Sequence, residues 1–283
     1  MNGAARVFSR VGQPLLLAGT IGLWLALGGG NGALGLTWLS LVAVIAALEQ
    51  LTPHRPTERP TLKRRGLLVA VGIVLSLALV TLGSGYEESL RPMLASISGS
   101  GPGAIWPHEL HWGVQTILLY FLADGLNYWM HRAIHRWPLL WRISGHGVHH
   151  SFHNLNAHHA VLTHPLELLF LAAPIALAAA AFNIEAQVVA AAALLIASIA
   201  TLAHANLALD TPVLGWLITQ PVHHRLHHSL DATEREANYA CTAIVWDRLF
   251  GTFDARAAKR TGLDSEPPTL AEHLLRPVRK ARD

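Results

Sequence analysis

Long apolar stretches limit this 283-residue chain to a small set of folds. Six of them are visible, at residues 14–27, 34–48, 66–82, 112–129, 165–182 and 186–202. Only 14% of all residues are charged, whereas soluble domains carry about 25%. Because a helix of roughly 20 apolar residues crosses a bilayer, the pattern predicts an all-α integral membrane protein.

The positive charges between these stretches predict their orientation. The first two segments are short for full spans and are joined by the glycine-rich link 28–32, so they could instead form a helical hairpin. Arginine and lysine gather in the links after the second, fourth and sixth segments, and the other links carry little positive charge. This alternation predicts about six transmembrane helices with both termini in the cytoplasm.

Cysteine content and net charge exclude several kinds of site. The single cysteine, Cys241, cannot form an internal disulfide, a cysteine-ligated iron–sulfur cluster or a four-cysteine zinc site. The formal net charge is +3. In a membrane protein we attribute this basicity to orientation and to contact with lipid headgroups, and we expect no nucleic-acid partner.

Histidine is the most unusual component of the chain. Of its 18 histidines, 14 lie between His131 and His228. A pair with i, i+4 spacing is followed by two triads with identical i, i+3, i+4 spacing: His131 and His135; His146, His149 and His150; His224, His227 and His228. Since positions three and four apart are neighbours on a helix, each set offers two or three imidazoles from one face. This spacing suits a shared metal centre.

The predicted topology brings these sets to one side of the membrane. The pair follows the fourth segment, the first triad lies in the next loop, His204 ends the sixth segment, and the second triad lies beyond it. Eight or nine imidazoles exceed what one tetrahedral or octahedral ion uses, so two metal ions are the economical interpretation. Ligand type alone leaves zinc, copper, iron and nickel open.

The other histidines have simpler interpretations. Solvated or structural roles are expected for His54, His108, His111 and His273. Histidines that are expected to solvate the loops, or to support the ligands indirectly, are His153, His158, His159 and His223.

Together the motifs resemble the histidine boxes of the fatty acid hydroxylase/sterol desaturase superfamily. The matching segments are DGLNYWMHRAIH at 124–135, HGVHHS at 146–151, HPLE at 164–167, HRLHHS at 224–229, NY at 238–239 and WDRLFGT at 246–252. The resemblance covers about residues 113–253, which is half of the chain.

The resemblance implies a membrane-bound non-haem di-iron oxygenase that hydroxylates an unactivated C–H bond of a fatty acyl, sterol or related apolar lipid. Two iron ions would be the cofactors and O₂ the co-substrate, with zinc as a substitute that purified protein can acquire. The same site could instead desaturate the lipid. Electrons would come from a separate ferredoxin- or cytochrome-type donor with its reductase, because the sequence offers no flavin, haem or iron–sulfur domain.

The resemblance also implies a ligand set. The box histidines carry over as ligands: His131, His135, His146, His149, His150, His224, His227 and His228. His204 resembles a further ligand, and Asn206 is expected to hold a metal-bound water. For His164, a ligand role and a structural role both stay open.

Three polar residues are expected to orient the ligands, because ligating imidazoles usually donate their other N–H to a carboxylate or carbonyl. Asp124 and Asn127 lie close to the helical face of His131. Glu167 lies three residues after His164 and is expected to orient it.

Three regions follow: N-terminal membrane anchor helices at 1–110, a fatty acid hydroxylase-like catalytic domain at 111–255, and a basic cytoplasmic tail at 256–283 that touches anionic lipid. The histidine boxes would sit in a cytoplasmic helical cap, and the lipid would enter laterally from the bilayer. A metal-ion transporter is disfavoured, since the third, fifth and sixth segments are almost wholly aliphatic at their centres. A bis-histidine haem carrier would need single histidines within spans.

Overall fold

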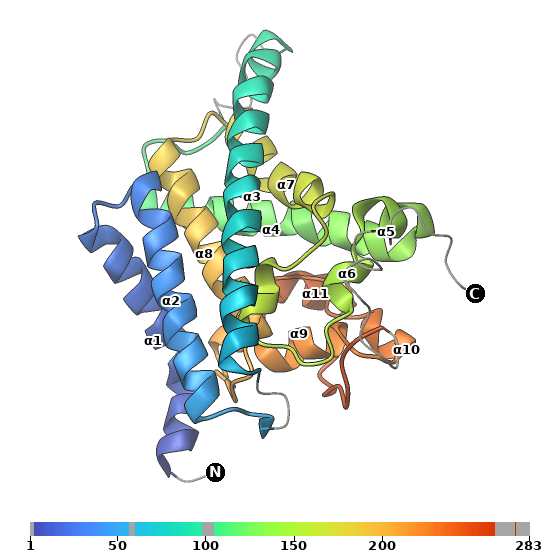
Figure 1. The fold of residues 1–283 in the computed structure, drawn as a ribbon. Helices are drawn as coiled ribbons and strands as arrows, with labels where there is room; N and C mark the ends of the chain where they lie inside the picture. Colours follow the sequence, from blue (N-terminus) through green and yellow to red (C-terminus); the bar gives the residue numbers. More distant parts are fainter. Residues whose placement is uncertain (1–2, 57–59, 98–104, 264–274, 276–283) are drawn as a thin grey trace.

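The computed structural model describes residues 3–56, 60–97, 105–263 and 275 (Figure 1). Within them the chain is helical and contains no β-strand. The elements are α1 (Gly3–Ala26), α2 (Asn31–Leu51), α3 (Leu62–Ile97), α4 (Trp112–Arg136), α5 (Pro138–Ser144), α6 (Gly147–His150), η3 (Ala157–Val161), α7 (Glu167–Ala181), α8 (Ala186–His204), η4 (Leu214–Trp216), α9 (Pro221–His227), α10 (Ala232–Arg235) and α11 (Val245–Leu249). The all-α prediction is confirmed, and most of each of the six apolar stretches lies in one helix: α1, α2, α3, α4, α7 or α8.

Three of the described helices are long and apolar enough to cross a membrane: Asn31–Leu51, Leu62–Leu94 and Ala186–His204. Helix α7 is apolar but has only 15 residues. Helix α4 runs crosswise behind α3 in Figure 1 and buries the polar side chains of Gln115, Asp124 and His131. About six spans were predicted from the apolar stretches and the charges between them, and within the described residues three helices combine the required length and hydropathy.

Helix α3 presents an almost wholly apolar surface. Only 6% of its most apolar window is buried inside the protein. Large exposed side chains lie along it: Leu67, Val71, Val74, Leu77 and Val80. A soluble protein rarely exposes so much contiguous apolar surface, whereas lipid tails accommodate it at no cost. This surface fits a helix in contact with a bilayer.

Helix α8 lies at the centre of the fold. It packs against α1, α2, α4, η3 and α9. Its buried alanines Ala190 and Ala191 let Trp24 of α1 approach closely, as small residues do at interfaces between membrane helices. The indole Nε1 of Trp38 on α2 donates to Thr201 Oγ1 at 3.1 Å. These contacts fix the position of α8 along its axis and therefore the position of His204, its last residue.

One buried carboxylate connects the apolar helices to the rest of the molecule. Glu49, near the end of α2, is 1% exposed. Its Oε1 accepts from the backbone N–H groups of Ala157 at 2.8 Å and Asn206 at 2.9 Å. Its Oε2 accepts from Arg65 Nη1 at 2.7 Å. A single side chain therefore joins α2, α3, η3 and the segment after α8.

The first part of the C-terminal region differs from the expected solvated tail. Ala258 and Thr261 are buried, and the backbone N–H of Leu230 donates to Arg260 O at 3.0 Å. Thr261 Oγ1 donates to His153 O at 2.6 Å. These bonds hold residues 258–262 against the segments after α6 and α9. Ala258, Thr261 and Gly262 are buried there, whereas Lys259 and Arg260 stay exposed. His273 and the basic residues Arg276, Arg279, Lys280 and Arg282 lie outside the described residues.

We expect Glu49→Ala to lower the free energy of unfolding by about 3–5 kcal/mol, because it leaves the Arg65 charge and two backbone donors buried without their acceptor. Thermal or denaturant unfolding in detergent measures this. The matched control is Glu88→Ala on the exposed surface of α3, which should change stability by less than about 0.5 kcal/mol. Equal stabilities of the two variants would show that Glu49 does not connect the helices.

Candidate metal centre

The helix ends carry the histidines into one region. His131 and His135 lie in the last turns of α4, and His204 ends α8. Between α5 and α6 the chain reverses at Gly145, whose φ of +71° lies in the left-handed region. A Cβ at this position would also lie 2.6 Å from the His164 side chain, so the turn requires glycine. The turn brings α6 back beneath the end of α4.

The structure gathers nine histidines into two groups, in each of which the candidate ligand atoms lie within 4.8 Å of one another. The five-histidine cluster contains His131, His135, His146, His150 and His227. The four-histidine cluster contains His149, His204, His224 and His228. The structure therefore brings together all eight box histidines and His204.

Each triad contributes to both clusters. Helix α6 sends His146 and His150 into the five-histidine cluster and His149 into the other. The histidines of the second triad, on α9, are distributed the other way: His227 joins the five-histidine cluster, and His224 and His228 join the four-histidine cluster. The rings of His150 and His228 stack at 4.3 Å between centroids, so the two clusters share a wall.

Hydrogen bonds to backbone carbonyls determine which ring nitrogen carries the proton. Nδ1 of His131 donates to Tyr239 O at 2.6 Å, and Nδ1 of His227 donates to Ala237 O at 2.9 Å. In the four-histidine cluster, Nδ1 of His149 contacts Leu162 O at 3.2 Å, and Nδ1 of His204 contacts Ala200 O at 2.8 Å. Because a carbonyl only accepts, Nδ1 is protonated in these rings and each neutral ring directs the lone pair of Nε2 inward.

The inward nitrogens lie too close together to be stable without a cation. In the five-histidine cluster, Nε2 of His131 lies 2.8 Å from that of His146 and 3.2 Å from that of His227. In the four-histidine cluster, Nε2 of His204 lies 3.1 Å from that of His224 and 3.3 Å from that of His149. Facing lone pairs repel each other, whereas two nitrogens bonded at about 2.1 Å to one ion, at right angles, lie about 3.0 Å apart. Each donor set therefore fits a metal ion.

Burial keeps these imidazoles neutral, as metal ligands must be. Loss of solvation lowers the pKa of His131 and His146 to about 3 and that of His149 to about 4. The same cause holds the pKa of the other box histidines well below the ordinary value: His135, His150, His224, His227 and His228.

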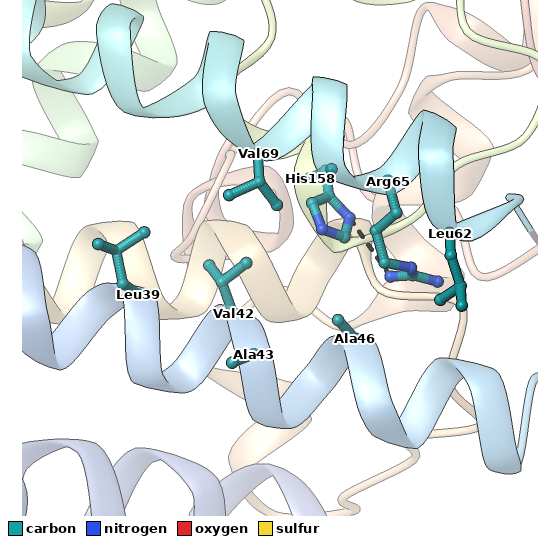
Figure 2. Close-up of a pocket in the computed structure, with 9 residues that line it drawn as sticks. Leu39, Val42, Ala43, Ala46, Leu62, Arg65, Val69 and His158 are labelled. Atoms are coloured by element: carbon teal, nitrogen blue, oxygen red, sulfur yellow. Dashed lines mark hydrogen bonds between the residues drawn. The ribbon is translucent and has the colours of Figure 1, made fainter.

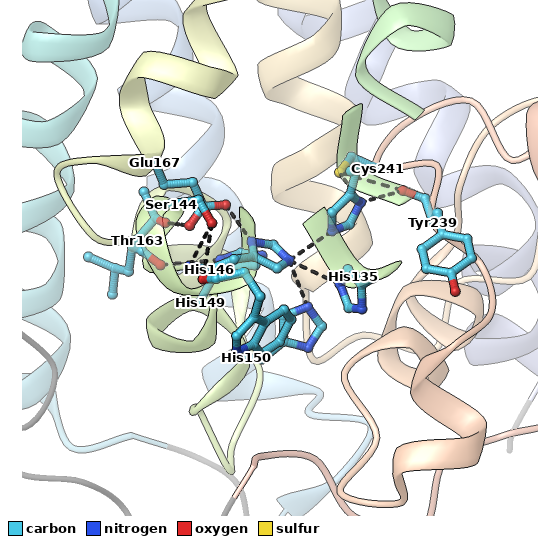
Figure 3. Close-up of polar contacts among 12 residues, drawn as sticks. His135, Ser144, His146, His149, His150, Thr163, Glu167, Tyr239 and Cys241 are labelled. Carbon is cyan, nitrogen blue, oxygen red and sulfur yellow. Dashed lines mark hydrogen bonds and ion pairs between the residues drawn. The ribbon is translucent and has the colours of Figure 1, made fainter. Parts of the chain in front are cut away.

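Glu167 orients a different histidine from the one predicted. Its Oε1 accepts from His146 Nδ1 at 2.6 Å, and its Oε2 accepts from the Thr163 hydroxyl (Figure 3). In the same view His135 and His150 point toward His146 from the opposite side. His164 itself lies outside both clusters: its Nδ1 accepts from Leu166 N at 3.1 Å, and its ring packs on Gly145.

Asp124 and Asn127 act on a backbone segment, whereas direct contact with the ligands was expected. Asp124 accepts from the backbone N–H groups of Thr242 at 3.2 Å and Ala243 at 3.1 Å, and from the Thr242 hydroxyl. The Asn127 side chain hydrogen-bonds Cys241. Both residues therefore hold the 241–243 segment, which begins two residues after Tyr239, whose carbonyl accepts from His131.

Asn206 was expected to hold a metal-bound water, but its side-chain amide binds the backbone of Arg55. Its Nδ2 donates to Arg55 O at 2.9 Å, and its Oδ1 accepts from Arg55 N at 2.9 Å. Both ends of the amide thus hold the loop that follows α2. This loop lies at the level of the clusters because Asn206 comes two residues after His204.

Two acidic residues near the clusters were not assigned a role from the sequence. Asp247 accepts from the backbone N–H groups of Tyr239 and Ala240, each at 2.8 Å, and so fixes the carbonyl that binds His131. Asp247 lies in the WDRLFGT segment at 246–252 that resembles the family, and this position could have indicated a role near the ligands. Glu236 Oε1 lies 3.6 Å from His135 Nδ1 and has no sequence signal.

The loop histidines are less exposed than a solvating role requires. His158 and His159 on η3 are 3% and 2% exposed. The His223 ring packs edge-on against Phe253 at 5.2 Å, and His153 packs against Gly262. By contrast, His54, His108 and His111 are exposed, as expected.

We expect the metal-free protein to lose stability as the pH falls below about 6.5, the ordinary histidine pKa. Below that value the unfolded chain binds protons, while His131, His146 and His149 stay neutral until their folded pKa values of about 3 to 4. Each such histidine lowers the free energy of unfolding by about 1.4 kcal/mol for every pH unit of acidification within this window.

Denaturant unfolding of metal-free protein at a series of pH values measures this effect. His111→Ala, at an exposed position, should leave the slope unchanged. A free energy of unfolding that stays constant between about pH 7 and 5 would contradict the burial of neutral imidazoles.

Comparison with known proteins agrees with this geometry. Residues 116–252 match the family model described as fatty acid hydroxylase. Ornithine lipid hydroxylase OlsE of Rhizobium tropici is 29% identical over 264 residues, which are 88% of this chain and 76% of that protein. No solved structure matches the chain significantly.

Alkylglycerol monooxygenases are also similar. The Danio rerio protein is 32% identical over 193 residues, covering 64% of this chain and 41% of that protein. The Homo sapiens protein is 30% identical over 148 residues, covering 48% of this chain and 30% of that protein. The chain therefore spans less than half of these two relatives. Residues 116–252, which match the family model, contain all nine clustered histidines. This similarity supports the fatty acid hydroxylase/sterol desaturase superfamily for that region, and the protein is an oxygen-dependent oxidoreductase.

Proposed function

We propose that the protein is a membrane-bound non-haem di-iron enzyme that hydroxylates an apolar lipid. The observation that carries this proposal is the convergence of nine neutral imidazoles into two adjacent clusters, each with the donor set of one metal ion. Imidazole also suits zinc, but zinc has no redox chemistry, and an oxygen-dependent oxidoreductase needs a metal that changes oxidation state. Two iron ions satisfy both conditions.

The residues around the clusters hold and shield the ligands. The five-histidine cluster would hold one iron and the four-histidine cluster the other. When bound, the iron ions supply the redox chemistry by which O₂ attacks a C–H bond. Glu167, Tyr239 O and Ala237 O fix the ring orientations of His146, His131 and His227. Burial of all nine rings keeps water away, which protects a reactive site from side reactions.

The substrate class follows from the relatives and the exposed apolar helices. The named relatives are a hydroxylase of ornithine lipid and monooxygenases of alkylglycerol. We therefore propose a membrane lipid that enters from the bilayer, with O₂ as co-substrate. Desaturation by the same site is the alternative. A separate ferredoxin- or cytochrome-type donor with its reductase would deliver electrons. The exposed Arg136 at the end of α4 and Arg142 in α5 offer a basic surface for it.

A multi-pass topology with cytoplasmic clusters fits the positions of the charges. Helix α2 ends, α3 begins and α8 ends at the level of the clusters, because Glu49 binds residues from all three regions. Exposed Lys63 and Arg64 lie at this level, and positive residues favour the cytoplasmic side. Six crossings with cytoplasmic termini would require α1, α4 and α7 to enter the bilayer too. We also propose the three regions predicted from the sequence: an anchor at 1–110, a catalytic domain at 111–255 and a tail at 256–283.

Metal analysis tests the two-site assignment. Anaerobically purified protein is expected to contain about two irons per chain. The double variant His224→Ala/His228→Ala halves the four-histidine cluster and should retain about one iron, as should His131→Ala/His146→Ala for the other cluster. Both variants should lose lipid hydroxylation, because the reaction needs both ions.

Two single variants serve as controls for the metal analysis. His111→Ala, at an exposed position, should keep about two irons. His164→Ala should also keep them, since this ring lies outside both clusters. Retention of about two irons in both double variants would refute the ligand assignment.

Lipid analysis of cells with and without the gene tests the reaction. Hydroxylation adds one oxygen atom to a membrane lipid, whereas desaturation removes two hydrogen atoms. We expect an oxygen-dependent, hydroxylated lipid that is absent from cells expressing His149→Ala. A product that persists with this variant would exclude the four-histidine cluster from the chemistry.

A further inference from the structure

A groove between α2 and α3 is separate from the two clusters (Figure 2). The cavity has a volume of about 300 Å³. Apolar side chains form most of its wall: Leu39, Val42, Ala43, Ala46, Leu62 and Val69. At one end the wall is polar and consists of Arg65 and His158, which lie side by side between the two helices. Neither residue belongs to the candidate metal centre.

The Arg65 guanidinium has donors that no atom of the described residues accepts. Arg65 is 6% exposed, and its Nη1 donates to Glu49 Oε2 at 2.7 Å. Its Nε and Nη2 are buried and have no hydrogen-bond partner among the described residues, and the same is true of His158 Nε2. Burying a charged donor without a partner costs more than the hydrogen bond itself contributes. The arrangement therefore lacks an acceptor at this end of the groove.

Pairing with Glu49 does not account for these free donors. The Glu49 carboxylate already accepts from two backbone N–H groups, those of Ala157 and Asn206, so one bond from Nη1 completes it. A lysine could make that single bond. The planar guanidinium offers further donors in a fixed fork, which matches the paired oxygens of a phosphate or carboxylate.

The position of the groove identifies the kind of molecule that brings this oxyanion. Arg65 lies in the first turns of α3, next to exposed Lys63 and Arg64, at the end of a helix that is apolar enough to cross a membrane. Cations at such an end lie at the level of lipid headgroups. The rest of the groove is apolar and runs along the two helices, which suits an acyl chain.

We propose that this groove binds an anionic membrane lipid. Its phosphate or carboxylate oxygens accept from Arg65 Nε and Nη2, and its acyl chain lies against Leu39, Val42 and Val69. The site goes beyond the proposed hydroxylase function, and lipid binding there requires neither metal nor turnover.

Binding to delipidated full-length protein in detergent tests the proposal. Native mass spectrometry and thermal unfolding compare phosphatidylglycerol, oleate, diacylglycerol and inorganic phosphate. Phosphatidylglycerol and oleate should bind and raise the melting temperature, because each combines an oxyanion with an acyl chain. Diacylglycerol lacks the oxyanion and phosphate lacks the chain, so neither should do so. Equal stabilisation by inorganic phosphate alone would replace the lipid site with a free-anion site and overturn the proposal.

Three variants locate the site. Arg65→Lys keeps the pair with Glu49 but loses the fork, and should weaken lipid binding about tenfold or more. Ala46→Phe fills the groove while leaving residue 65 as arginine, and it should do the same. Lys63→Gln removes an exposed cation at the same level and should bind like the parent.

The pattern across the three variants decides the outcome. Parent-like binding by both Arg65→Lys and Ala46→Phe, or an equal loss in Lys63→Gln, would show that the lipid binds to the surface at large. Iron content, measured on the same samples, should stay at the parent level in all three variants. The test thereby separates failure of the lipid site from failure of the metal assignment.

Discussion

The convergence of neutral imidazole lone pairs is the constraint on which the rest of the structure depends. Without a cation, nitrogens about 3 Å apart repel each other, so the surrounding protein must hold every ring in place. For five rings it does so through the outer nitrogen Nδ1, which donates to a backbone carbonyl or to Glu167: His131, His146, His149, His204 and His227. Asp124 and Asp247 in turn fix the segment that carries the Tyr239 carbonyl. The polar core is therefore a set of supports for two metal sites.

The apolar helices α2 and α3 are connected to the region of the clusters by the hydrogen bonds of one side chain, Glu49. Glu49 reaches from α2 to η3, to α3 and to the segment after His204. Displacement of α2 or α3 would consequently be transmitted to the four-histidine cluster. A lipid that binds Arg65 would engage the same network, which places a bound headgroup beside the region that positions the ligands.

Local periodicity predicted that the histidine pair and the two triads come together, and the family resemblance added His204. The repeated i, i+3, i+4 spacing and the positions after apolar segments indicated a shared site on one side of the membrane. The division of each triad between two clusters could not be predicted, because it depends on the angle at which α6 and α9 meet. The same reason explains Glu167, whose partner is His146 across a turn and not the nearby His164.

The sequence by itself determined the helical class, the long apolar segments and the grouping of the histidine pair and the two triads, since these depend on composition and on local spacing. Tertiary structure alone decided the crosswise path of α4, the roles of Asp124, Asn127 and Asn206, and the free donors of Arg65 in the groove. Each of these depends on contacts between segments far apart in the chain. Such contacts are set by how helices pack, and helix packing leaves no local signature in the order of residues.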